Sequence, residues 1–157
     1  TRKESSAASD VYKRQAFTVE HRAELDVAAM SAAAQQVCGL RNFLPFCKPR
    51  EGSTTIRTLE ELRVERDGNG VVEFFFRADA FCHHMVRALV GGLVKVGEGK
   101  WEPGRLVGMC EEAGRGGSDF PMFVFPAHGL VLEGVGYPEP GEWAVRNQQT
   151  RARRDAE

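Results

Sequence analysis

Apolar and polar positions along the chain first predict a helix and then a β-hairpin. Apolar residues recur at helical spacing between Leu25 and Gly39, and Asp26 is placed to cap the N-terminus of that helix. Two runs with alternating character, Arg57–Arg66 and Val71–Arg77, flank the sequence Asp-Gly-Asn-Gly, which is a strong turn signal. The Pro- and Gly-containing segment between the helix and the hairpin predicts a loop.

Helices dominate the pattern after the hairpin. We expect a helix over Ala80–Val96 that is capped by Asp79, and a shorter helix that begins at Pro103. Alternation over Gly129–Tyr137 predicts a last strand. The order of elements favours an α+β fold, with helices packed on one face of a mostly antiparallel sheet.

Length and composition limit the organisation of the chain. Its 157 residues, 42% of them hydrophobic, suffice for one domain with a core. Residues 1–15 are polar and are expected to be a non-native leader, residues 16–140 the domain, and residues 141–157 a basic tail that is frayed or disordered. The largely apolar stretch Ala88–Val96, which includes Lys95, is far shorter than the roughly 20 residues that a membrane span needs.

Charge and cysteine usage narrow the candidate chemistry. The formal net charge is −1, so an RNA partner would have to be attracted by locally placed cations. The four cysteines lack paired spacing, which is typical of reduced cytoplasmic thiols. Cys82-His83-His84 also lacks the ligand spacing of a zinc site, so no metal is expected there.

Arg87 is the most informative residue of the predicted helix. Both faces of Ala80–Val96 are largely apolar, which would put this guanidinium in a partly dry environment where an unpaired charge is costly. A carboxylate or a phosphate would satisfy it, whereas a structural ion pair or a side chain that reaches water is the alternative. Gly91, one turn further on, allows either close approach of another backbone or ordinary tight helix packing.

The phenylalanines outside the hairpin leave two interpretations open. They can stack on RNA bases, or they can fill the edges of the core. The residues concerned are Phe43, Phe46, Phe120, Phe123 and Phe125.

The block Asp79-Ala-Phe-Cys-His-His-Met-Val-Arg87-Ala-Leu-Val-Gly91 resembles the signature of the bacterial A-type tRNA pseudouridine synthases. Weaker similarities to the C-terminal domain of that family occur in the same order along the chain. They include Asn42-Phe43, Ile56-Arg57-Thr58, Ala127-x-Gly129-Leu130-x-Leu132 and Tyr137-Pro138. The resemblance extends from about Leu25 to Pro138.

The resemblance implies a function and a role for several residues. Such enzymes isomerise uridine to pseudouridine in the anticodon arm of tRNA, with an Asp nucleophile, a flipped base and no metal or organic cofactor. It implies that Arg87 orients and ionises the Asp, that His83, His84 and Arg57 contact RNA, and that Leu130 contacts the uracil. It also implies a cytoplasmic homodimer whose partner is the anticodon stem-loop.

One departure from the family pattern bears on activity. The family nucleophile lies in an Arg-Thr-Asp motif, whereas the Arg57-Thr58 pair of this chain is followed by Leu59 and matches a different family position. We therefore expect a C-terminal half that lacks the nucleophile and is inactive by itself. A catalytically dead RNA-binding module of the same fold is the alternative, and a dimerisation domain is a third. The Phe-rich stretch Phe120–Pro126 also departs from the family pattern.

Overall fold

The computed structural model describes residues 18–136, 139–142, 144–145 and 148. The expected leader, residues 1–15, and most of the expected tail, residues 141–157, lie outside the described residues. The helices and strands follow the order α2 (Val27–Val37), β1 (Gly39–Asn42), β2 (Ile56–Arg66), β3 (Val72–Ala78), α3 (Met85–Gly97) and α4 (Arg105–Gly114). Short 3₁₀ turns are η1 (Leu44–Phe46), η2 (Ala127–Gly129) and η3 (Pro140–Glu142).

Helix α2 forms as its sequence predicts. The Asp26 carboxylate accepts a hydrogen bond from the backbone N–H of Ala29 at 3.0 Å, which satisfies one of the amides that a helix N-terminus leaves unpaired. The face that repeats at helical spacing is fully buried, and consists of Met30, Ala33, Ala34 and Val37. The N-cap and the buried face of α2 are therefore both those that the sequence predicts.

The sheet is antiparallel throughout, in the order β1-β2-β3. The predicted hairpin is confirmed, and Asp67 closes its turn by accepting from the amides of Asn69 and Val71 at 2.8 and 2.9 Å. The sequence pattern does not predict strand β1. It is four residues long and pairs with Ile56–Leu59, so it depends on a distant partner rather than on its own pattern.

A register shift between Leu59 and Glu61 interrupts the pairing of β2 with β3. Because the shift adds a residue to one strand, Leu59 and Leu62 are both buried although they are three positions apart. Arg57 is two residues before Leu59 and so lies on the same, buried face of β2. The bulge thus places a cation on the core side of the sheet.

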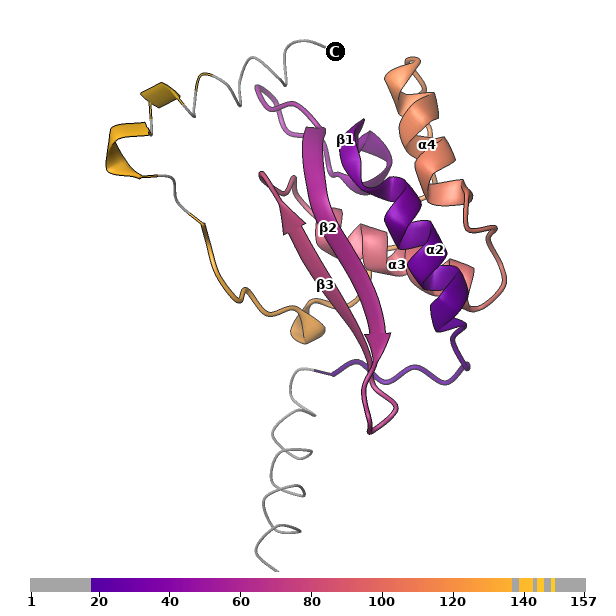
Figure 1. Cartoon of the computed structure of the whole chain (residues 1–157). Helices are drawn as coiled ribbons and strands as arrows, with labels where there is room; N and C mark the ends of the chain where they lie inside the picture. Colours follow the sequence, from indigo (N-terminus) through magenta and orange to yellow (C-terminus); the bar gives the residue numbers. More distant parts are fainter. Residues whose placement is uncertain (1–17, 137–138, 143, 146–147, 149–157) are drawn as a thin grey trace, which may run out of the picture.

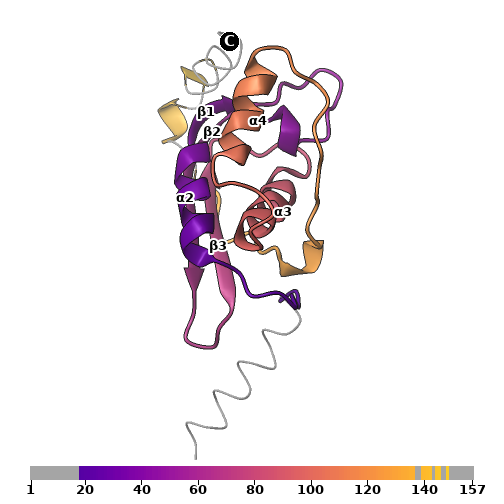
Figure 2. The ribbon, with the colours of Figure 1, turned by 90° about the vertical axis from the view of Figure 1, so that its right-hand side faces the viewer.

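Helix α2 packs on β2, and α3 and α4 pack against α2, so the helices gather on one side of the hairpin (Figures 1 and 2). The predicted α+β arrangement is confirmed. Helix α4 begins two residues after the expected start at Pro103, and buries Leu106, Met109 and Ala113 as its pattern predicts. In the described part of the chain, no helix has both the length and the apolar character needed to cross a membrane.

The predicted last strand is wrong. Residues 130–136 form no strand, and Leu130, Val131, Leu132 and Val135 are between 51% and 77% exposed. An alternating segment becomes a strand only when another strand pairs with it, and none does so among the described residues. The segment instead runs along the outside of the molecule beyond β3 (Figure 1).

Candidate functional site

The segment that joins β3 to α3 is not helical, contrary to the expectation of a helix from Ala80. Helix α3 begins at Met85, and Asp79 does not cap it. The Asp79 carboxylate instead accepts from the backbone N–H of Thr58 at 2.9 Å and of Ala80 at 2.8 Å. Asp79 therefore links the end of β3 to β2 by a hydrogen bond, and residues 80–84 form a non-helical connection that leads into α3.

His84 makes the turn into the helix. It is the N-cap of α3 and has left-handed backbone angles, φ 68° and ψ −3°, which side-chain-bearing residues adopt rarely. Its ring stacks on that of His83, with centroids 4.1 Å apart and an interplanar angle of 18°. Partial burial, followed by the charges of His83, Arg87 and Lys48, lowers the pKa of His84 below its usual value of 6.5. His84 is therefore neutral near pH 7.

Arg87 lies in the first turn of α3, and its side chain is half-buried. Its Nε donates to the carbonyl oxygen of Phe125 at 2.7 Å, and the N–H of Phe125 donates to the carbonyl oxygen of Arg87 at 3.0 Å. Its Nη1 lies 3.5 Å from Nδ1 of His84. The guanidinium is thus held by neutral groups on two sides.

The charge of Arg87 is not neutralised within the described part of the chain. The ion pairs found there join other residues, and none places a carboxylate within 4.0 Å of this guanidinium. The structural ion pair that the sequence left open is therefore not seen among these residues. A planar guanidinium with donors remaining can bind a carboxylate or a phosphate in a forked geometry.

Gly91 lets the segment after α4 come close to α3. A Cβ atom at this position would overlap the backbone carbonyl of Phe123. This close approach is the first of the two interpretations that the sequence left open, and it brings Phe125 within reach of Arg87. Phe43 and Phe46 are buried and belong to the core, whereas Phe123 is 43% exposed and lies over Lys95.

Arg57 and Leu130 make contacts other than those that join the histidines to Arg87. Arg57 is only 5% exposed, and its Nη1 donates to the carbonyl oxygen of Ile56 at 2.6 Å and to Thr54 Oγ1 at 3.4 Å. The side chain of Leu130 is 51% exposed, at the end of η2. Direct contacts therefore link three of the five residues singled out from the sequence, namely His83, His84 and Arg87.

The expectation of four reduced cysteines is wrong for two of them. Cys47 and Cys82 form a disulfide, with Cα atoms 5.6 Å apart, and they are 35 residues apart in sequence. Their pairing depends on how η1 meets the entry to α3, which spacing alone does not reveal. Cys38 and Cys110 are unpaired thiols, and burial raises the pKa of Cys110 to about 12.

The sequence analysis did not identify Lys48 and Arg50, which share a cavity with His83. Lys48 and Arg50 lie in the loop after η1, and with Phe81, Cys82 and His83 they line an open cavity of about 510 Å³. The signal that could have found them is the pair of cations around Pro49 in a loop. Within the described residues, no three His, Cys, Asp or Glu side chains come together as a metal site.

Known proteins resemble this chain over most of its length. A family model described as tRNA pseudouridine synthase matches residues 33–138. The tRNA pseudouridine synthase A of Leifsonia xyli subsp. xyli is 50% identical over 130 residues, which are 83% of this chain and 44% of the relative. That of Frankia casuarinae is 50% identical over 128 residues, 82% of this chain and 46% of the relative.

A more distant relative gives the same result. The tRNA pseudouridine synthase A of Tropheryma whipplei strain Twist is 37% identical over 145 residues, which are 92% of this chain and 50% of the relative. The chain spans about half the length of the curated relatives it matches. On the family match and these identities, the chain belongs to the tRNA pseudouridine synthase family.

Proposed function

We propose that this chain supplies one part of the active site of a tRNA pseudouridine synthase that acts on uridine in the anticodon arm. The observation that carries the proposal is the guanidinium of Arg87. It is half-buried, anchored through Nε to Phe125, and lacks a carboxylate partner among the described residues. It also lies within the sequence block that resembles the family signature.

The proposed reaction rearranges one glycosidic bond. The C1′–N1 bond of the flipped uridine breaks, the uracil turns, and C5 bonds to C1′ while the proton on C5 is released. A nucleophilic Asp from a segment outside these 157 residues takes part, and Arg87 is the positioning residue that pairs with it. A guanidinium at 4–6 Å lowers the pKa of a carboxyl group by about 1–3 units, which keeps a sheltered Asp ionised.

The remaining assignments concern RNA. We propose that His83 and His84 line the RNA cleft beside Arg87. Their rings stack on each other, and Nδ1 of His84 lies next to the guanidinium, so the three side chains form one polar group. Arg57 is proposed as an RNA contact and Leu130 as a uracil contact. Leu130 is 51% exposed and so is available for this contact, whereas Arg57 is only 5% exposed.

The whole enzyme is proposed to work as a cytoplasmic homodimer, without a metal or an organic cofactor. Its RNA partner is the anticodon stem-loop of tRNA. The 157-residue chain is proposed to be inactive by itself.

The test of this function is reconstitution. The chain is mixed with the N-terminal half of a relative such as the Leifsonia xyli enzyme, and tritium release from tRNA labelled at C5 of uridine is measured. Arg87→Ala is expected to lower the rate about 10²–10³-fold, the usual effect of removing one preorganised charged or polar donor. Because the Asp then loses its guanidinium, the acidic limb of the pH–rate profile should also move up by about 1–3 pH units.

Arg115→Ala is the matched control, since Arg115 is exposed on the surface after α4. Tritium release by the chain alone would contradict the assignment of the nucleophile to another segment. Full activity of the Arg87→Ala mixture would contradict the role of Arg87. If no mixture is active but the chain binds tRNA with unchanged affinity after Arg87→Ala, the alternative of a catalytically dead RNA-binding module holds.

A further inference from the structure

The cavity beyond His83 has no role in the chemistry proposed above. It has a volume of about 510 Å³ and opens between the loop after η1 and the segment that enters α3. Pockets of about 300–1,000 Å³ are the size that holds small ligands and single nucleotides. His83 is shared with the Arg87 site, because its ring stacks on His84.

Two cross-links hold the walls of the cavity together. The disulfide between Cys47 and Cys82 joins the two segments covalently, and the backbone N–H of Lys48 donates to the carbonyl oxygen of His83 at 2.8 Å. Lys48 therefore emerges from backbone that is fixed relative to His83. The cavity is a preformed part of the surface.

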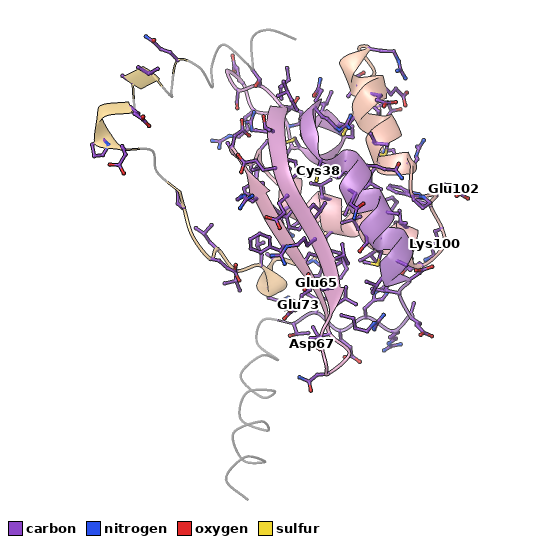
Figure 3. The ribbon with its side chains drawn as sticks, viewed as in Figure 1. Cys38, Glu65, Asp67, Glu73, Lys100 and Glu102 are labelled. Carbon is purple, nitrogen blue, oxygen red and sulfur yellow. A yellow bond between two sulfur atoms is a disulfide. The ribbon has the colours of Figure 1, made fainter. Side chains whose placement is uncertain are left out.

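The charge lining the cavity is positive. Lys48 and Arg50 are exposed, and among the residues that the structure describes no carboxylate lines the cavity with them. Three carboxylates, those of Glu65, Asp67 and Glu73, lie at the turn end of the hairpin (Figure 3). That end is opposite to the end at which β3 leads into residue 79. The cavity thus favours an anion.

The cavity also offers an aromatic face. Phe81 is 42% exposed, so part of its ring is available at the surface of the cavity. A ligand that suits two cations and an exposed aromatic ring carries both negative charge and a flat ring. An unpaired nucleotide has both, because its phosphate binds Lys and Arg and its base stacks on aromatic side chains.

We propose that this cavity binds one unpaired nucleotide of the RNA adjacent to the uridine at the Arg87 site. Its phosphate is held by Lys48 and Arg50, and its base lies against Phe81. The proposal rests on the proposed function for the identity of the RNA. It adds a site that fixes the neighbour of the target and so selects which uridine reaches Arg87.

The test measures binding by fluorescence anisotropy, with the full chain and two labelled RNAs, an anticodon stem-loop and a short oligouridylate. Lys48→Ala combined with Arg50→Ala should weaken binding and reduce the slope of log K against log salt by about 0.7, because the two cations neutralise one phosphate and a single strand contributes about 0.7 per phosphate neutralised. Phe81→Ala should weaken binding about 5- to 100-fold, and Phe81→Trp should restore it, since stacking on an aromatic face tolerates the exchange.

Arg22→Ala combined with Arg115→Ala is the matched control, because it removes two exposed cations that lie outside the cavity. The proposal is overturned if this control lowers the affinity and the salt slope as much as the cavity variants do. It is also overturned if the cavity variants bind within twofold of the unchanged chain, or if the unchanged chain binds neither RNA at low salt.

Binding and catalysis separate the two proposals. If Arg87→Ala abolishes reconstituted activity while the cavity variants bind normally, the cavity proposal fails and the proposed function stands. If the cavity variants lose affinity as expected but no mixture releases tritium, the proposed function fails and the RNA site stands.

Discussion

The two ends of α3 have different surroundings although they belong to one helix. Toward its C-terminus, Leu89, Leu93 and Val96 are almost completely buried, and Gly97 lies directly beneath Met30. At its N-terminus His84 and Arg87 are only half-buried and the chain enters through a left-handed residue. The comparison shows two different environments in one helix: the C-terminal end is fixed by core packing, whereas the N-terminal end leaves the guanidinium of Arg87 partly exposed.

The largest effect is expected at the packed end. Leu93→Ala should lower the free energy of unfolding by about 2–5 kcal/mol, because it leaves a cavity where a fully buried side chain was. Phe81→Ala, just ahead of the open end, should change it by about 0.5 kcal/mol or less, although the ring is larger. Urea denaturation of both variants measures the difference, and equal losses would contradict the contrast between the two ends.

A smaller effect is expected where the two ends meet. Gly91→Ala should destabilise by about 1–3 kcal/mol, because the new Cβ displaces the backbone of Phe123 and with it the anchor of Arg87. Gly108→Ala in α4 is a control of opposite sign. Nothing lies within 4 Å of a Cβ there, so the higher helix propensity of Ala should stabilise by about 0.5–1 kcal/mol. If both substitutions stabilised the protein, the backbone at Phe123 would have moved away from the new Cβ without a cost in free energy.

The smallest effect is expected at the left-handed residue. His84→Gly should leave the chain about 1 kcal/mol more stable than His84→Ala does, because Gly adopts a φ of 68° without a steric penalty. Thermal unfolding followed by circular dichroism is sufficient to compare the pair. A more stable Ala variant would mean that α3 extends back to Ala80, as its sequence pattern predicts.

The sequence predicts those elements whose stabilising partners are close along the chain. Asp26 caps α2 because the amide it needs is three residues away, and the hairpin closes on its own turn. Asp79 is an equally suitable cap by residue type, but its carboxylate is taken by the amide of Thr58, 21 residues earlier. The start of α3 depends on that strand partner, so local pattern misplaces it.

The residues of the candidate site also differ in whether the sequence alone could identify them. Arg87 could be identified from the sequence because an Arg on a largely apolar helix needs a partner wherever the helix packs. Lys48 and Arg50 could not, since they meet His83 only in the folded chain, where the N–H of Lys48 donates to the carbonyl oxygen of His83. The segment after Gly129 has the alternation of a strand, yet it remains unpaired among the described residues, because alternation does not specify a partner.

The bonds between Arg87 and Phe125 have an evolutionary consequence. On the Phe125 side, both use main-chain atoms, one N–H and one carbonyl oxygen. The two hydrogen bonds therefore do not depend on the side chain of residue 125, and substitutions that keep its amide hydrogen preserve them. Proline is the exception, since it has no N–H to donate. Position 125 can thus change in side chain, proline apart, without loss of these two bonds to Arg87.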